Sequence, residues 1–124
     1  MRIIFNLVGS LDLIENKGMF RGLLSSFIEK YEKENLEITL YFSETALFAL
    51  IIEENWIWEA LKNPLLTLCL NATHLEIQSI KPLVLNLIKK KGLYIEKIYI
   101  IPTNLFYEGI TSKMLDSDSR IITI

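Results

Sequence analysis

Five short apolar runs alternate along this chain with longer segments of helical periodicity, and this alternation constrains the fold more than any other feature. The runs are apolar at almost every position, which is typical of strands buried on both faces of a sheet. The predicted strands are 3–8, 37–42, 65–70, 94–101 and 120–124. Strands that alternate with helices form parallel sheets through right-handed crossovers. The sequence therefore predicts an α/β fold: a five-stranded, mostly parallel sheet with helices on both faces, in three α/β/α layers.

The segments between the runs predict the helices. Apolar residues recur every three to four positions from Lys17 to Glu34, as in an amphipathic helix. Ser43 is a candidate N-cap for a second stripe that ends near Ile51. Further helices are predicted over 56–62, over 82–91 (starting at Pro82 and capped by Gly92) and over 104–114. Residues 71–79 predict a loop or an irregular turn.

Length and composition indicate one globular domain over residues 1–124. Hydrophobic residues make up 51% of the chain and charged residues 23%, a balance that a disordered chain lacks. The net charge of −2 and the pI of about 5.4 are unlike the basic surface of a nucleic-acid-binding protein. We therefore expect partners other than nucleic acid.

Targeting and membrane signals are weak in this sequence. The apolar run at the start stops at Gly9 without a cleavage site of small residues, and no stretch of about 18 apolar residues could span a membrane. Cys69 is the single cysteine, so the chain has no internal disulfide and no metal site built from several thiolates. We expect a cytoplasmic protein without membrane contact, bound cofactor or metal.

Candidate chemistry lies where the predicted strands end, because ligands of open parallel sheets collect at the carboxyl ends of the strands. Cys69, near the end of the third strand, is the strongest nucleophile there. A free cysteine also serves often as a small buried hydrophobe, and this alternative stays open. His74 could stabilise a thiolate or could simply be solvated. Trp56 and Trp58 fit either the core or a subunit interface.

Known nucleotide motifs are absent. No GxxxxGK[ST] or GxGxxG pattern follows a predicted strand. The residues after the first strand are rich in Leu and Ile, unlike a flavodoxin phosphate loop. The first strand also ends without the paired aspartates of a response-regulator receiver.

Three segments together resemble the DsrE/DsrF-like sulfur-relay family, which includes the TusD type. The segment 66–72 (LTLCLNA) resembles the cysteine-bearing strand of that family. The segment 41–47 (YFSETAL) has its strand, acidic turn and helix start, and 116–124 (DSDSRIITI) resembles its terminal strand. The order and length of the predicted strands match along nearly the whole chain.

The resemblance implies a five-stranded parallel α/β domain that assembles into dimers, trimers or hexamers, of itself or with paralogous subunits. It also implies that Cys69 carries sulfur as a persulfide, received from a donor protein and passed to an acceptor protein, with no cofactor. The alternative is a non-catalytic structural or interaction subunit, because residues 73–77 (THLEI) replace the small residues, basic pair and glycine that often follow the cysteine. A small-molecule enzyme using the same edge is a third possibility.

Overall fold

The computed structural model of the protein describes residues 1–31, 35–93 and 97–124 and has the predicted α/β architecture. Five strands form one sheet in the order β4-β3-β2-β1-β5, and every neighbouring pair is parallel. The strands are β1 (Arg2–Leu7), β2 (Glu37–Phe42), β3 (Leu66–Asn71), β4 (Ile98–Ile101) and β5 (Ser119–Thr123). The helices are α1 (Ile14–Tyr31), the 3₁₀ helix η1 (Glu44–Ile51), α2 (Ile57–Ala60), α3 (Ala72–Ile77), α4 (Lys81–Lys90) and α5 (Thr103–Met114).

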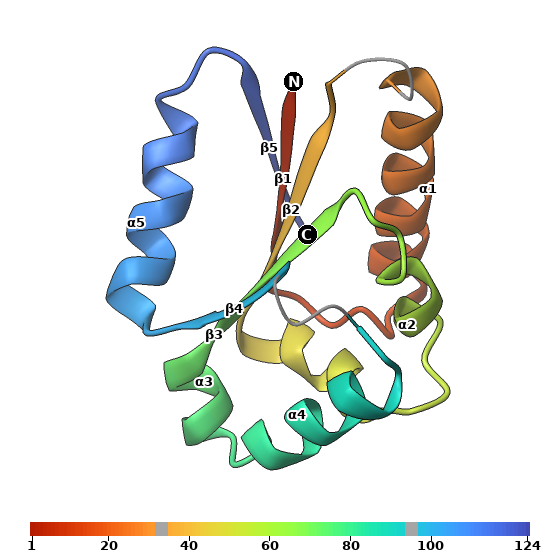
Figure 1. Ribbon diagram of the computed structural model, residues 1–124, viewed down its shortest axis with the longest axis vertical. Helices are drawn as coiled ribbons and strands as arrows, with labels where there is room; N and C mark the ends of the chain where they lie inside the picture. Colours follow the sequence, from red (N-terminus) through yellow and green to blue (C-terminus); the bar gives the residue numbers. More distant parts are fainter. Residues whose placement is uncertain (32–34, 94–96) are drawn as a thin grey trace.

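The two faces of the sheet are covered unequally. Figure 1 shows α1 and α2 to the right of the strands and α5 alone to their left. Side chains on the first face join one large core with α1, η1, α2 and α4, including Phe5, Leu40 and Leu68. On the second face a smaller cluster forms beneath α5, from Ile4, Tyr41, Cys69, Phe106 and Ile110. The three-layer arrangement is therefore confirmed, with a single helix in the second layer.

Both tryptophans belong to the packing of the first face. Trp58 is 2% exposed and its Nε1 donates to the carbonyl of Ile52 at 2.9 Å. Trp56 is half-buried, packs edge-on against Phe20 with ring centroids 5.5 Å apart, and lies beneath the Arg21 guanidinium. Of the two alternatives that the sequence left open, the core or a subunit interface, Trp58 lies in the core.

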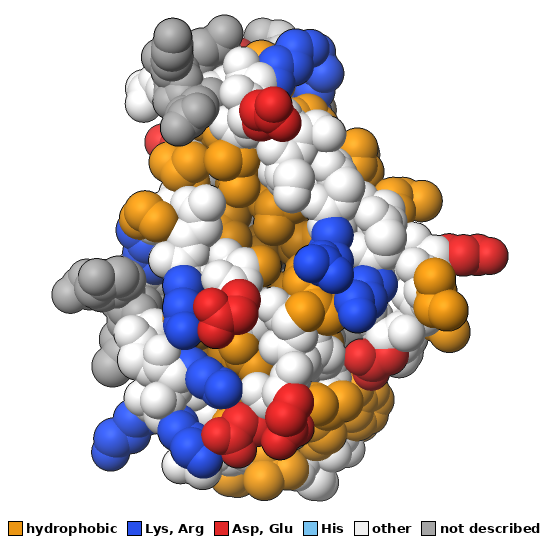
Figure 2. Space-filling view, turned by 90° about the vertical axis from the view of Figure 1, so that its right-hand side faces the viewer, with side chains coloured by type: hydrophobic (Ala, Val, Ile, Leu, Met, Phe, Trp, Pro, Cys, Tyr) orange, Lys and Arg blue, Asp and Glu red, His pale blue; other side chains and the backbone are white. Residues whose placement is uncertain are grey.

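A shallow hollow marks the surface between α1 and α2. It has a volume of about 230 Å³ and is lined by Arg21, Leu24, Ser25, Trp56, Glu59 and Ala60. Figure 2 shows hydrophobic side chains along the middle of this face, with charged side chains on both sides of them. The one-turn α2 leaves part of the first layer thin, which explains why apolar atoms are visible here.

The structure corrects the prediction of a loop over 71–79. Ala72–Ile77 form α3, and Asn71 caps it because its side-chain Oδ1 accepts a hydrogen bond from the backbone N–H of His74 at 3.1 Å. An asparagine at the N-cap satisfies a backbone donor that the first turn leaves without a partner. The short helix was missed because only one of its residues, Leu75, is buried, so no apolar stripe marks it.

Other boundaries also differ from the predictions. Ser43 precedes a helix, but η1 is a 3₁₀ helix and the Ser43 side chain makes no capping hydrogen bond. The first helix begins at Ile14, three residues before the predicted start at Lys17, and the piece predicted over 56–62 has α-helical structure only at Ile57–Ala60. Residues 32–34 and 94–96, the ends of a predicted helix and strand, lie outside the described residues.

We expect Phe106 to hold the second layer in place. Phe106 is fully buried and its ring packs edge-on against Tyr41, with centroids 5.1 Å apart. Replacing it with alanine should lower the free energy of unfolding by about 3–5 kcal/mol, the usual cost of removing a buried phenylalanine. Urea unfolding followed by circular dichroism measures this loss.

Its neighbour Tyr107 is the matched control for that change. Tyr107 is 39% exposed and contacts the Phe106 ring from outside the cluster. Tyr107→Ala should cost about 1 kcal/mol, since it removes one aromatic contact and the lost ring is partly in water. Equal losses for the two variants would show that α5 does not depend on Phe106.

Candidate functional site

Cys69 lies in the middle of the second sheet face rather than at its rim. It is paired in register with Tyr41 on one side and Tyr99 on the other. From above, Phe106 and Ile110 of α5 complete its surroundings, and the residue is only 7% exposed. The thiol is therefore packed among aromatic and aliphatic side chains, as a small core residue would be.

The surroundings of Cys69 shift the pKa of its thiol in two opposite directions. Burial raises the pKa of Cys69 above its ordinary value, because a thiolate would lose its hydration there. The Lys113 ammonium and hydrogen bonding with Tyr41 act in the opposite direction and lower this pKa, but by less than burial raises it. Since the thiolate is the nucleophilic form, Cys69 is poorly activated in this conformation.

Lys113 and Tyr41 form the polar part of this cluster. The Lys113 Nζ donates to the Tyr41 hydroxyl at 2.9 Å and lies 5.1 Å from the centre of its ring. Gly109 makes this approach possible, since a Cβ at that position would come within 3.2 Å of the same hydroxyl oxygen. The sequence alone had not marked Lys113 or Tyr41 as partners of Cys69. The spacing of Phe106, Ile110 and Lys113 along α5 is the signal that puts Lys113 on the sheet side.

The rim of the sheet above Cys69 is closed by hydrogen bonds. Asn71, two residues beyond Cys69, is fully buried. Its Oδ1 accepts from the Thr103 hydroxyl at 3.1 Å as well as from the backbone of His74, and the Thr103 backbone N–H donates to the Thr73 hydroxyl at 3.2 Å. These bonds fasten the start of α5 to the end of β3 and the start of α3 at the carboxyl edge.

The less covered side of Cys69 faces the edge of the sheet. Tyr99 is 52% exposed and Thr67, the preceding residue on the same face of β3, is half-buried. The neighbouring residue on this side is the half-exposed Tyr99, whereas α5 covers the thiol on the other side. Any reagent would therefore approach across the open part of the second face, beside β4.

His74 does not assist Cys69 in this structure. Its Nδ1 accepts a hydrogen bond from the backbone N–H of Glu44 at 3.1 Å. Gln78, the C-cap residue of α3, donates from its side-chain amide to the Glu44 carbonyl at 3.1 Å. Glu44 has a φ of 51°, a left-handed conformation that is unfavourable for a residue with a side chain. His74 and Gln78 thus fix a strained turn, and the hydrogen bonds found among the described residues include none between His74 and Cys69.

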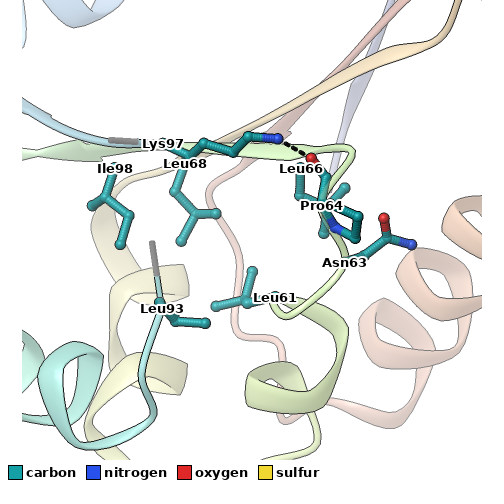
Figure 3. A pocket seen from close by; sticks show the side chains of 8 residues that line it. All are labelled: Leu61, Asn63, Pro64, Leu66, Leu68, Leu93, Lys97 and Ile98. Atoms are coloured by element: carbon teal, nitrogen blue, oxygen red, sulfur yellow. Dashed lines mark hydrogen bonds between the residues drawn. The ribbon is translucent and has the colours of Figure 1, made fainter. Parts of the chain in front are cut away.

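Among the hollows of the surface, one reaches the sheet face of Cys69, because Thr39 and Thr67, two residues before Tyr41 and Cys69 on their strands, line it. The small cavity in Figure 3 holds about 20 Å³, close to one water molecule, and lies between Leu61, Leu68, Leu93 and Ile98 on the first face, where the Lys97 ammonium donates to the Pro64 carbonyl. A larger, open hollow of about 370 Å³ lies at the amino ends of β2 and β3. Three more open hollows lie between α1 and α2, along β4 and beside Gly92.

Within residues 1–31, 35–93 and 97–124, no three His, Cys, Asp or Glu side chains come together as a metal site would require. In the same part of the chain, no helix combines the length and the apolar character needed to cross a bilayer.

Comparison with known proteins gave no match among protein-family models, among curated proteins or among solved structures. The resemblance to the DsrE/DsrF-like family thus depends on the three sequence segments alone. In the structure these segments contain β3 with the start of α3, the turn between β2 and η1, and β5. The first two lie side by side in the sheet, and the third forms one edge.

The Lys113 ammonium should set how far the Cys69 thiol can ionise. In Lys113→Met the favourable charge is lost, so the pKa of Cys69 should rise further and the thiolate fraction at any given pH should fall. Alkylation rates of the native protein from neutral pH to about pH 10, the range of thiol and tyrosine ionisation, measure this shift.

Lys89→Met, which removes an exposed ammonium from α4 on the other face, is the control and should leave the pH profile unchanged. If the pH profile of Cys69 alkylation moves equally in both variants, the net charge of the protein sets this pKa, and the position of the Lys113 ammonium beside Cys69 does not.

Proposed function

We propose that this chain is a DsrE-like α/β subunit that works by binding other protein subunits, with Cys69 as a packing residue rather than a sulfur carrier. The observation that supports this proposal is the burial of the Cys69 thiol beneath α5, at 7% exposure and with a raised pKa. The proposal places the protein in the cytoplasm, where an unpaired thiol is kept reduced.

Sulfur transfer makes demands that this conformation does not meet. In such a transfer the Cys69 thiolate attacks the outer sulfur of a donor persulfide. A new S–S bond forms on Sγ, the donor S–S bond breaks, and the donor leaves as its own thiolate. The donor cysteine must therefore come within bonding distance of Sγ. Phe106 and Ile110 occupy the space above the sheet from which it would approach.

Exposed apolar side chains support a binding role. The helix α5 and the residue after it expose Leu105 (50%), Tyr107 (39%), Met114 (64%) and Leu115 (86%). Ile14 and Ile77, on α1 and α3, are exposed to 89% and 75%. Large apolar side chains in contact with water are common singly, but several on one short helix favour a surface that another protein covers.

Sulfur carriage by Cys69 is the second candidate, and one observation favours it. Lys113 and Tyr41 place a cation and a hydroxyl beside the thiol, and both would stabilise a thiolate once it is formed. A rotation of the half-exposed Tyr99 ring would then give a donor access from the open side of the sheet. His74 has no role in this scheme, since its ring holds the Glu44 turn.

The reactivity of the thiol separates the two candidates. The native protein is treated with an alkylating reagent and, separately, with a protein or small-molecule persulfide donor, followed by mass spectrometry. If Cys69 only packs, its alkylation should be at least about 100-fold slower than that of a free thiol, because it must wait for local opening. No persulfide should accumulate on it.

A matched control places a cysteine on the outside of the same helix. In the double variant Cys69→Ser, Ser112→Cys, the new thiol lies at an exposed position of α5 and should react at the rate of a free cysteine. Rapid alkylation of Cys69 with an apparent pKa below about 8.5, the free value, or a persulfide on Cys69 in the native protein, would overturn the packing role and favour the carrier.

A further inference from the structure

The two edges of the sheet differ from each other, and both are open within the described residues. β4 pairs only with β3, and β5 only with β1. On either side of β5, the Asp118 carbonyl accepts from the Arg2 N–H of β1 and the Ile124 N–H donates to the Asn6 carbonyl of β1. Alternate residues of a strand direct their backbone groups to opposite sides. Ile121 and Thr123 therefore direct their N–H and C=O groups away from the sheet. Such unpaired groups are a template for another strand.

The β4 edge also carries an apolar hollow. It has a volume of about 330 Å³ and lies on the first face, between α4 and the outer strand. Leu85, Ile88, Ile98 and Ile100 line it together with Lys89. On the opposite face of the same strand, Tyr99 is 52% exposed. An added strand would thus find backbone partners and apolar contacts on both faces.

The residues that precede the two edge strands carry charges of opposite sign, whereas β5 itself contains the exposed Arg120. Lys97 precedes β4, and Lys89 borders its hollow. Asp116 and Asp118 precede β5, with side chains 33% and 70% exposed although they also contact Arg2 and the N-terminal amine. In a parallel pair the amino ends of the two strands lie together, which would bring the aspartates beside Lys97. A two-fold pairing of β4 with β4 would instead place two lysine-bordered hollows side by side.

We propose that a second copy of this chain adds its β5 to the β4 edge in parallel, so that the sheet continues from one subunit into the next. This inference rests on the proposed binding function and names its partner and surfaces. The half-buried Ile122 on the first face of the incoming strand would pack over the hollow. Because the two edges are different surfaces, the contact is head-to-tail and forms a ring if the rotation closes and a filament if it does not.

Two variants block one edge each and leave the fold intact. Leu85→Lys puts an ammonium into the hollow from a position of α4 that is already 39% exposed. Thr123→Pro removes an outward N–H of β5 at an exposed position, which edge strands tolerate. It leaves the backbone hydrogen bonds to β1 in place and loses only the 3.5 Å bond from Asn6 Nδ2 to the Thr123 hydroxyl. Circular dichroism and thermal unfolding check that both variants fold.

Analytical ultracentrifugation of each variant alone and of their equimolar mixture tests the proposal. The wild-type chain should be oligomeric and each variant alone monomeric. The mixture should contain a one-to-one dimer, because the intact β5 of one variant meets the intact β4 of the other. Leu83→Lys, 54% exposed on the same helix but outside the hollow, should assemble as the wild type does.

The other outcomes overturn the proposal in distinct ways. If Leu85→Lys dissociates the oligomer but Thr123→Pro does not, β4 binds something other than β5. If the wild type is oligomeric and both variants assemble normally, the interface lies elsewhere, and the proposed binding function stands without this inference. A wild-type chain that is monomeric at every concentration excludes self-assembly through either edge, and together with a reactive Cys69 it excludes the proposed function as well.

Discussion

The packing of α5 against the second face of the sheet is the contact on which the chemistry of this protein depends. Phe106 and Ile110 bury Cys69 against the sheet, and the Lys113 ammonium bonds to Tyr41 beside it. The same helix is fastened at its start by Thr103 to Asn71. One helix therefore decides whether the single thiol is a reagent or a small core residue. At 7% exposure beneath Phe106 and Ile110, the thiol is packed as a small core residue would be.

The rim of the sheet shows how polar residues can close an edge that usually binds ligands. Asn71 ends β3 and caps α3, while His74 and Gln78 of the following turn hold the strained Glu44 backbone. This arrangement has a cost, since the Ser43 hydroxyl and the Asn71 Nδ2 are buried without a hydrogen-bond partner among the described residues. Thr73, His74 and Thr103 are hydrogen-bonded at this edge, and open hollows lie elsewhere, along β4 and at the amino ends of β2 and β3.

Much of the fold could be predicted from the sequence because its strands are apolar on both faces and its longer helices carry apolar stripes. The candidate site could not be predicted to the same extent. Cys69 was found near the end of its strand, but the strand continues to Asn71 and into α3, a helix with one buried residue and no apolar stripe. Tyr41 and Lys113 are 72 residues apart, and only the crossover of α5 over β2 brings them together.

The sequence by itself determined the α/β class, the parallel strands and the presence of one cysteine, because hydrophobic periodicity and residue identity are local properties. The tertiary structure decided how α5 covers β2 and β3, which buries that cysteine, and which strands form the edges. The order β4-β3-β2-β1-β5 places a basic strand start at one edge and an acidic one at the other. Neither the covering of a thiol nor the neighbours of a strand is encoded in any short segment, since both depend on contacts between residues far apart in the chain.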